Sequence, residues 1–414
     1  MHALRRLLAP DSAVLLAVLV TAAVALTVLA ARRGRLWPRV AAAGVALSLV
    51  FSAGAIGVNV HFGYFTSWAD VTTGAVHAGL APGATRGSSA AAAHRTGARR
   101  AAPIPPDTGP RAVVLPAVRG GGQLSRGQVD ALLRRRPARA GGDLLSVTLT
   151  GRRSRITRRG LVWLPPQYRA AAFSRTRFPV VELIPGTPGQ PRDWVHFLHI
   201  TNLLAALTAR GTIAPMVVVM APSNPPHGRG QECTDQGTRG AQDSTYVGVD
   251  VPADITAGFR VFAPGPHWAV AGYSTGGYCA VDLTLKHPGT YGAVADLDGY
   301  LSPREDGHLW HVIFNRDEAA IAAYTIPIEL ARDHCRLPPF YLAAGTGNLE
   351  DLNDLRTLRR LLTGRAAVTT HVTPGGHRFP VWAAELPAVL TWISSHIAAG
   401  PRARTPGRPS TTSR

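Results

Sequence analysis

The chain has 414 residues, enough for one large domain with additional segments, and a formal net charge of +19 at pH 7. Lys286 is its only lysine, so nearly all the positive charge comes from arginines scattered among abundant Ala, Gly and Pro. The densest arginines flank apolar segments, and the sequence contains no known nucleic-acid-binding motif. We therefore expect no nucleic-acid partner. A basic surface that faces anionic lipid or wall polymer is the remaining interpretation of the charge.

Two uncharged apolar runs near the N-terminus, residues 13–31 and 40–58, are each about as long as a helix that crosses a bilayer. A cleaved signal peptide is the alternative interpretation of the first run. The second run and the lack of a clear cleavage site favour a two-helix transmembrane anchor within residues 1–60. The arginines of this region are Arg5 and Arg6 before the first run, and Arg32, Arg33, Arg35 and Arg39 between the two runs. The positive-inside rule then places the connecting loop in the cytoplasm, so we expect a cell-membrane protein whose chain after Val58 is extracytoplasmic.

Composition divides the rest of the chain into a linker, a folded domain and a tail. Residues 61–142 are rich in Ala, Gly, Pro and Arg and have little hydrophobic periodicity, which predicts a largely flexible linker with a short helix at Gln128–Arg136. Residues 143–399 alternate short apolar runs with amphipathic segments, a pattern typical of an α/β fold. Residues 400–414 have the composition of a disordered tail.

The apolar runs in residues 143–399 have the length and composition of buried strands. They predict an opening hairpin and then a mostly parallel sheet flanked by helices, with a closing helix at the end. The hairpin is expected at Leu144–Leu149 and Leu161–Leu164, the core strands at Pro179–Ile184, Met216–Met220, Trp268–Gly272, Ala293–Leu297, Phe340–Ala344 and Val368–Val372, and the closing helix at Val381–Ile397.

A G-x-S-x-G motif, Gly272 to Gly276, lies between the strand pattern WAVAG and a helix pattern at residues 275–287. Small residues on both sides of Ser274 let the chain turn sharply from strand to helix. Such a turn exposes a serine Oγ, and the start of the helix directs free N–H groups and a positive dipole end at the same place. Ser274 is therefore the candidate nucleophile.

A serine hydroxyl needs a base and, behind the base, an acid. His377 lies between the last expected strand and the closing helix, where the Ser–acid–His order of α/β-hydrolases places the histidine. The acid should follow the strand that ends near Ala344, but Asn348 stands where an aspartate is expected. We favour Asp351 as the acid, with Glu350 as the alternative; for either, a helix N-terminal acid is the purely structural interpretation.

The oxyanion hole needs two backbone N–H groups. Thr275 follows the nucleophile, and Thr187 lies in the Pro-Gly-Thr-Pro-Gly loop after the third expected strand, where Pro188 has no N–H to offer. The cysteines are Cys233, Cys279 and Cys335, which allow at most one disulfide. We expect Cys279, on the helix after Ser274, to be a small buried apolar residue.

Several segments together resemble one enzyme family. They are LVWLPPQY (161–168), FPVVELIPGTPGQPRDW (178–194), GYSTGGYCA (272–280), DLDGY (296–300) and GGHRFPVW (375–382). Residues from about Asp143 to Ala399 resemble the esterase family that includes esterase D, feruloyl esterases and the antigen 85 mycolyltransferases, and the apolar hairpin resembles that of actinobacterial envelope members. The resemblance implies an α/β-hydrolase fold with Ser274 as nucleophile and His377 as general base. The sequence departs from the family at Pro185, where a histidine often precedes the loop glycine, and at Asn348, which leaves the acid open.

These features predict a membrane-tethered serine esterase or acyltransferase that works through an acyl-enzyme and needs no metal or cofactor. Its expected substrates are esters, with lipid or cell-wall acyl esters as candidates. The long segment Gly299–Arg336 between two core strands is expected to form a lid or pocket wall. The alternative hypothesis is a non-catalytic cell-envelope binding protein that retains the fold.

Overall fold

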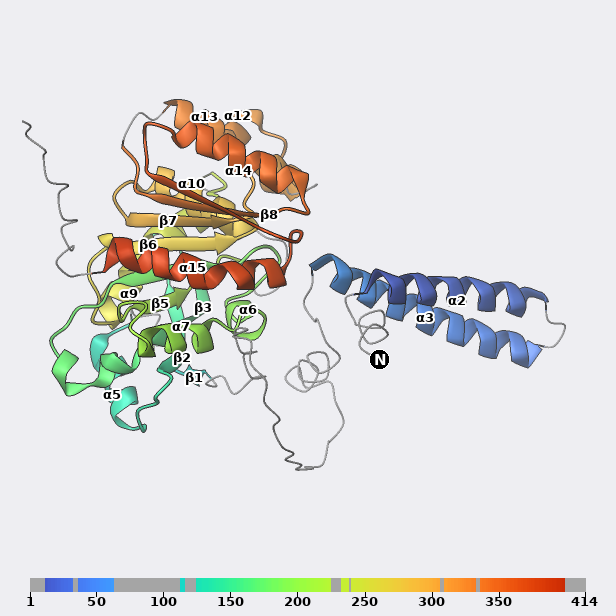
Figure 1. Cartoon of the computed structure of the whole chain (residues 1–414), viewed down its shortest axis with the longest axis horizontal. Coiled ribbons are helices and arrows are strands. Elements are labelled where there is room, and N and C mark those ends of the chain that lie inside the picture. The colour runs from blue at the N-terminus through green and yellow to red at the C-terminus, as the bar shows by residue number, and fades with distance from the viewer. Residues whose placement is uncertain are drawn as a thin grey trace, which may run out of the picture. The chain divides into compact units, whose positions relative to one another are not determined.

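The structure, a computed structural model, is shown in Figure 1. It describes residues 12–32, 36–62, 112–115, 124–224, 232–237, 240–305, 309–332 and 336–398. The expected tail and most of the expected linker lie outside these residues. The N-terminal helical hairpin and the sheet-containing body belong to separate units, and each is described by itself.

The hairpin consists of two helices that pack against each other, α2 (Ala13–Arg32) and α3 (Leu36–Phe62). Their described side chains are almost all apolar, and large ones such as Val24 and Phe51 are 60% and 73% exposed. The stretch Arg39–Val60 is long and apolar enough to cross a membrane, with a mean hydropathy of 2.0, whereas the apolar stretch Ala13–Leu29 is shorter. Length and composition thus support one of the two expected spans, and the second stays a prediction.

A nine-stranded mixed sheet forms the centre of the body. The strands lie in the order β1-β2-β3-β5-β4-β6-β7-β8-β9; β3 is antiparallel to both of its neighbours, and all other pairs are parallel. Their bounds are β1 Val113–Val114, β2 Asp143–Thr150, β3 Thr157–Leu164, β4 Val180–Ile184, β5 Val217–Met220, β6 Gly265–Tyr273, β7 Tyr291–Leu297, β8 Phe340–Gly345 and β9 Val368–Thr373. All the strands expected from the apolar runs are present, and the edge strand β1 is additional.

Helices cover the sheet, and α7 and α15 lie across its near face in Figure 1. Helix α10 packs against β4, β6 and β7. The main helices are α5 Arg126–Arg134, α7 Ile200–Ala209, α9 Val251–Gly258, α10 Thr275–Lys286, α14 Leu349–Leu362 and α15 Phe379–Ile397. Shorter ones are η2 Pro166–Arg169, η3 Ala171–Phe173, α6 Asp193–His196, α8 Asp243–Thr245, η4 Tyr246–Asp250, η5 Pro303–Glu305, α11 Leu309–Ile313, α12 Glu318–Ala322 and α13 Ile326–Arg332.

Two elements within the expected linker region, β1 and α5, contact the body. Strand β1 pairs with β2, and Val129 and Leu133 of α5 are buried in the main core. A capping box closes the start of α5, because Ser125 accepts a hydrogen bond from the Gln128 N–H and the Gln128 side chain accepts one from the Ser125 N–H. The short helix expected at Gln128–Arg136 therefore forms two residues earlier in the chain.

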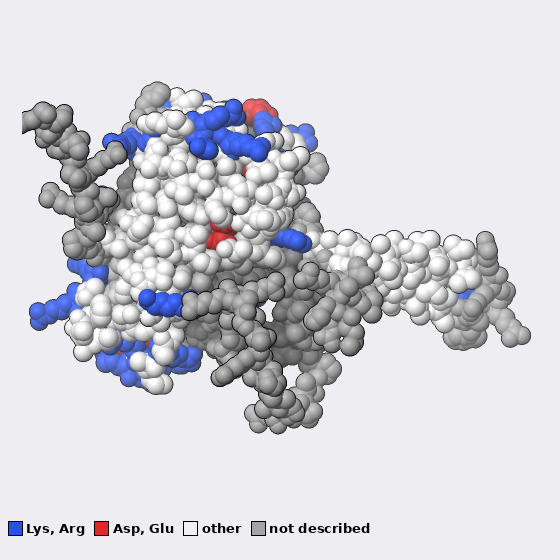
Figure 2. Space-filling view, viewed as in Figure 1, with Lys and Arg blue, Asp and Glu red and all other residues white. Residues whose placement is uncertain are grey.

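Part of the arginine excess has a structural role inside the body. Arg158 forms a buried ion pair with Asp243, and Arg169 donates hydrogen bonds to the carbonyl oxygens of Leu133 and Pro137 at 2.7 and 3.0 Å. Figure 2 shows other Lys and Arg side chains gathered over the end of the body formed by α13 and α14, with a largely uncharged face across α15. The positive charge is thus distributed between buried contacts and separate surface regions.

A glutamate lies in the middle of the central strand β4. Glu182 is fully buried, and its Oε2 accepts a hydrogen bond from the Tyr291 hydroxyl at 2.9 Å. Burial raises the pKa of Glu182 to about 8, against the opposing effect of the Tyr291 hydrogen bond. The folded protein therefore holds a proton on Glu182 up to about pH 8, whereas the unfolded chain loses it near the ordinary value of 4.5.

This difference predicts a pH dependence of stability. The free energy of unfolding should fall as pH rises from about 4.5 to 8, because the folded state binds one more proton than the unfolded state. Glu182→Gln keeps the shape of the side chain and cannot ionise, so its stability should not fall over this pH range. The advantage of the variant over wild type in free energy of unfolding should therefore be roughly 3–5 kcal/mol larger at pH 8 than at pH 5. Urea unfolding at both pH values measures this, with Glu350→Gln on the exposed start of α14 as a control. Parallel pH profiles for wild type and Glu182→Gln would contradict the assignment.

Candidate active site

The chain turns sharply at Ser274, the single residue between β6 and α10. Its backbone angles are φ 57° and ψ −129°, a conformation that a non-glycine residue rarely adopts. The Ser274 N–H donates to the Leu297 carbonyl at 2.9 Å, and the Ser274 carbonyl accepts from the N–H groups of Gly277 and Tyr278. Neighbouring backbone on both sides therefore holds the strained turn in place.

Glycines allow this turn because other backbone atoms lie where a Cβ would be. A Cβ on Gly276 would lie 2.1 Å from the Ile184 carbonyl oxygen, and one on Gly272 would lie 2.0 Å from the Gly276 carbonyl oxygen. Gly186, in the loop after β4, is also close, since its Cβ would lie 3.0 Å from the Ser274 Cβ. The G-x-S-x-G spacing thus reflects tight packing of β4, β6 and α10 around the serine.

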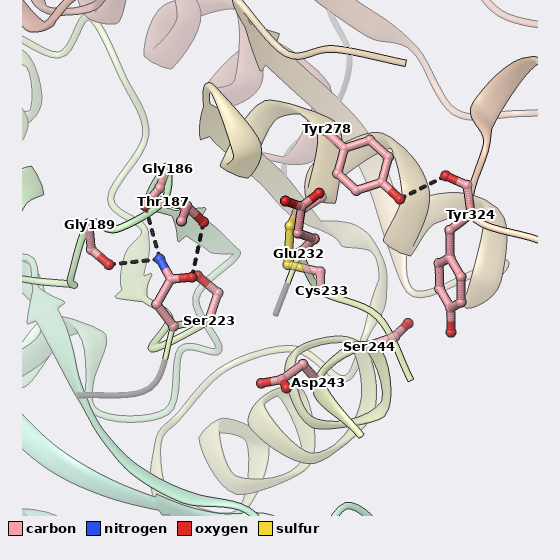
Figure 3. Close-up of a disulfide and its surroundings, with 12 residues drawn as sticks. Gly186, Thr187, Gly189, Ser223, Glu232, Cys233, Asp243, Ser244, Tyr278 and Tyr324 are labelled. Atoms are coloured by element: carbon pink, nitrogen blue, oxygen red, sulfur yellow. Dashed lines mark hydrogen bonds between the residues drawn. A yellow bond between two sulfur atoms is a disulfide. The ribbon is translucent and has the colours of Figure 1, made fainter. Parts of the chain in front are cut away.

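The loop after β4 contains Thr187, one of the two expected oxyanion-hole residues. Asn224, which follows β5, donates from its side-chain amide to the carbonyl oxygens of Gly186 and Gly189 at 2.9 and 2.8 Å. Its Oδ1 accepts a hydrogen bond from the Thr187 hydroxyl at 3.2 Å (Figure 3). Asn224 is 5% exposed and fixes this loop beside Ser274. Sequence reasoning missed it, although its place in the short segment after a core strand was the available signal.

Thr275, the other expected oxyanion-hole residue, begins α10 and is 4% exposed. Amides in the first turn of a helix have no partner within the helix, and the helix dipole makes this end positive. Thr187 and Thr275 therefore lie on the two chain segments next to Ser274, the loop after β4 and the start of α10. Their role as oxyanion donors stays a prediction.

His377 lies between β9 and α15, in a loop attached to the loop after β8. The Thr346 N–H donates to the Thr373 carbonyl at 2.9 Å, and the Gly347 N–H donates to the Gly375 carbonyl at 2.6 Å. This pairing extends the β8–β9 ladder beyond the sheet. It brings the histidine segment next to the start of α14.

Two aspartates lie close to His377. Ligand-capable atoms of Asp298, Asp351 and His377 all lie within 4.8 Å of one another. Asp351, the favoured acid, is in the first turn of α14 and is 9% exposed, whereas the alternative acid Glu350 is exposed and outside this group. Oxygen and imidazole ligands of this kind could also hold a metal ion, but a strained serine turn on the neighbouring strand favours proton transfer as their chemistry.

Asp298 is the residue of this group that sequence reasoning did not predict. It follows β7 directly, with φ 55°, and is 2% exposed. Its Oδ1 accepts from the Gly345 N–H at 2.8 Å and its Oδ2 from the Trp382 Nε1–H at 2.7 Å. The Trp382 ring stacks on Tyr273, the residue before the nucleophile, with 4.5 Å between ring centroids. These contacts connect the serine turn to the acidic group. The available signal was the segment DLDGY.

Asn348, where the sequence departs from the family pattern, has a structural role. It is the N-cap of α14, and its side-chain oxygen accepts a hydrogen bond from the Glu350 N–H at 3.0 Å. Asn348 thus begins the helix that carries Asp351 one turn later.

The expectation for Cys279 as an unpaired apolar residue is wrong. Cys279 forms a disulfide with Cys233, 46 residues earlier, with 5.7 Å between the Cα atoms (Figure 3). Both residues are 1% exposed. The bond ties the segment before α8 to α10, five residues after the nucleophile. Cys335 lies outside the described residues.

The segment expected as a lid, Gly299–Arg336, contains η5 and the helices α11, α12 and α13. It is attached to α10: the Tyr278 hydroxyl donates to the Tyr324 carbonyl at 2.8 Å (Figure 3), and Lys286 pairs with Glu329 at 2.6 Å. The Lys286 ammonium also lies 4.6 Å from the centre of the Tyr324 ring. The segment is therefore anchored on the helix that begins at the nucleophile, and its function as a lid stays a prediction.

The strand order and the serine turn agree with comparisons to known proteins. A family model described as "Putative esterase" matches residues 156–393, more than half of the chain. The chain belongs to this esterase family. The family match covers the elements from β3 to the middle of α15, including the serine turn and the histidine segment.

The chain has relatives by sequence and by structure. An uncharacterised protein of Corynebacterium glutamicum is 28% identical over 270 residues, and the match covers 61% of this chain but only 62% of that relative's length. A solved ferulic acid esterase has a TM-score of 0.54 at 18% identity, covering 62% of this chain and 98% of its own. An S-formylglutathione hydrolase from Agrobacterium tumefaciens has a TM-score of 0.53 at 17% identity, covering 63% and 98%. These likenesses confirm the expected α/β-hydrolase fold.

Proposed function

We propose that this esterase is a serine hydrolase that cleaves or transfers the acyl groups of esters through Ser274 and His377. The observation that carries the proposal is the backbone of Ser274, with φ 57° between a buried strand and the start of a helix. This is the geometry by which α/β-hydrolases hold a nucleophile. The histidine segment after β9 supports it, because His377 lies with two carboxylates that follow β7 and β8, the next strands after β6 in the sheet.

In the proposed reaction, His377 takes the proton of Ser274 Oγ as Oγ bonds to the ester carbonyl carbon. The carbonyl oxygen becomes an oxyanion that accepts hydrogen bonds from the N–H groups of Thr187 and Thr275. The intermediate collapses, the bond to the alcohol oxygen breaks, and His377 gives its proton to the leaving alcohol. Water or an acceptor hydroxyl then attacks the acyl-enzyme with His377 again as base, which releases the acid or a new ester and restores Ser274.

Asp351 is the proposed acid behind His377. It belongs to the group of ligand-capable atoms within 4.8 Å, and Asn348 begins the helix that holds it in place. A carboxylate at this position orients the imidazole and stabilises the positive charge that His377 acquires, without taking the proton itself. Neither step requires a metal or a cofactor.

We also propose that the catalytic body is outside the cytoplasm and tethered to the membrane. The apolar stretch Arg39–Val60 and the exposed apolar side chains of α2 and α3 support an anchor, and the arginines between the two helices favour a cytoplasmic loop. The buried Cys233–Cys279 disulfide suits an oxidising compartment. A tethered enzyme meets esters at the membrane or wall, so lipid or cell-wall acyl esters are the proposed substrates.

A fluorophosphonate probe tests the enzyme proposal. The full chain, solubilised in detergent, should react in a one-to-one ratio, and mass spectrometry of a protease digest should locate the adduct on Ser274. Heat-denatured protein should stay unlabelled, because only the folded site activates the hydroxyl. Well-folded protein that does not react would contradict the proposal and favour the non-catalytic envelope-protein hypothesis. Comparing esters of increasing acyl length with and without an alcohol acceptor would then separate hydrolysis from transfer.

A further inference from the structure

His377 has two carboxylate neighbours from different parts of the sheet, although a serine hydrolase requires only one. Asp298 follows β7, and Asp351 lies at the start of the helix after β8. One oxygen atom of each aspartate and one ring nitrogen of His377 lie within 4.8 Å of one another. Either aspartate is therefore close enough to act on the imidazole electrostatically.

Asp298 is held as a buried acceptor. Each of its oxygens accepts one N–H hydrogen bond, from Gly345 at 2.8 Å and from Trp382 at 2.7 Å, and its own N–H donates to the Ala343 carbonyl at 2.8 Å. Two N–H donors compensate the burial of a negative charge. Trp382 is 3% exposed and stacked on Tyr273, so the donor cannot move away easily.

Asp351 is held differently, by its place in the first turn of α14, where the helix dipole stabilises a negative charge. The hydrogen bonds that join the loops after β8 and β9 keep this turn beside the histidine segment. Asp298 is thus fixed by specific donors, and Asp351 by a helix terminus.

We propose that Asp298 and Asp351 both act on His377, as two positioning residues that share the task usually given to one acid. This inference rests on the proposed function. When Ser274 Oγ transfers its proton to one ring nitrogen, His377 becomes a cation, and both carboxylates stabilise that charge while staying ionised. Asp298 also orients the ring, because its own position is fixed by Gly345 and Trp382.

Two other charged groups lie near these residues in the chain or on α14. Arg378 follows it in the chain, and beyond Asp351 on α14 lies Asp354. Burial, followed by the hydrogen bond and charge of Glu305, raises the pKa of Asp354 to about 8. Below that pH Asp354 is mostly neutral and adds little negative charge beside Asp351.

The test measures kcat and KM against pH for wild type, Asp298→Asn, Asp351→Asn and the double variant, with a p-nitrophenyl ester as substrate. Each single variant should lose about 10- to 100-fold in kcat, and the double variant about 10⁴-fold, with KM little changed in all three. The acidic limb of kcat/KM should move to lower pH in each single variant and further in the double, because each removed charge favours the neutral imidazole. Glu318→Gln, at the exposed start of α12, is the control and should leave kcat and the acidic limb of kcat/KM unchanged.

Two results would overturn the inference. One is an Asp351→Asn variant with wild-type kcat and an unshifted acidic limb of kcat/KM. The other is an Asp298→Asn variant with the same behaviour. Trp382→Phe removes only one donor to Asp298 and should lower kcat without moving KM, which covers the case that Asp298→Asn does not fold.

Fluorophosphonate labelling separates this inference from the proposed function. Unlabelled wild type would defeat the proposed function, whereas labelled wild type with only one effective aspartate would defeat the pair.

Discussion

Ser274→Ala is expected to lower kcat by about 10⁵- to 10⁶-fold and to abolish fluorophosphonate labelling. The reason is chemical: the proposed attacking atom is Ser274 Oγ, and the residue before it and the helix after it stay in place when only this oxygen is removed. Alanine also keeps the positive φ of this position with a side chain no larger than serine. We therefore expect the Tm of Ser274→Ala to stay within a few degrees of wild type. Ester hydrolysis by the purified, detergent-solubilised full chain measures the effect.

Two further variants control this experiment. Ser395→Ala, on an exposed position of α15, should leave kcat unchanged. The double variant Ser274→Ala with His377→Ala should be no slower than Ser274→Ala alone, because a nucleophile and its base act as one unit. Esterase activity that survives in Ser274→Ala at more than a few per cent would mean that another residue is the nucleophile.

Gly276→Ala is expected to disrupt the turn itself. The added Cβ would lie 2.1 Å from the Ile184 carbonyl oxygen and 2.9 Å from that of Pro185, and both are backbone atoms that cannot rotate away. The end of β4 and the start of α10 must separate, which also moves the oxyanion segments at Thr187 and Thr275. We expect the free energy of unfolding to fall by about 3 kcal/mol. We also expect probe labelling to fall by more than the smaller fraction of folded protein can explain. Urea unfolding and probe labelling under native conditions measure the two effects.

Gly127→Ala is the matched control, because a Cβ at Gly127 on α5 meets no atom within 4 Å. This variant should be as stable as wild type or about 0.5–1 kcal/mol more stable, since alanine has a higher helix propensity than glycine. If Gly276→Ala matches Gly127→Ala in stability and labelling, the close packing of β4 against α10 does not constrain the site.

The apolar runs predicted the centre of the sheet well because its central strands, such as β4, β5 and β8, are buried on both faces. Met220 and Val270, on β5 and β6, are fully buried, so alternation of polar and apolar residues is absent and continuous runs mark the strands. Helix α15 was predicted to within two residues of its start for a related reason, since its apolar residues recur on one side. The two-residue strand β1 could not be predicted, because its position depends on pairing with β2.

The candidate site was predicted in part. The sharp turn at Ser274 was predicted because its determinants are local: the strand, the small residues and the helix are adjacent in the sequence. His377 was identified from its order in the chain. Asp298 was missed because the acid was sought only after β8. The pairing of Cys233 with Cys279 was missed because it joins residues 46 positions apart, and nothing local to Cys279 indicates its partner.

The sequence by itself determined the class of fold, the strained turn that carries the candidate nucleophile and the apolar N-terminal segments, since each depends on residues within a few turns or one strand of each other. Only the tertiary structure decided which side chains meet His377. The parallel order β7-β8-β9 brings three strand ends to one edge of the sheet, so Asp298, Asp351 and His377 converge from separate loops. Asn348, at the position where an acid was expected, instead caps α14, and this helix brings Asp351 to the histidine.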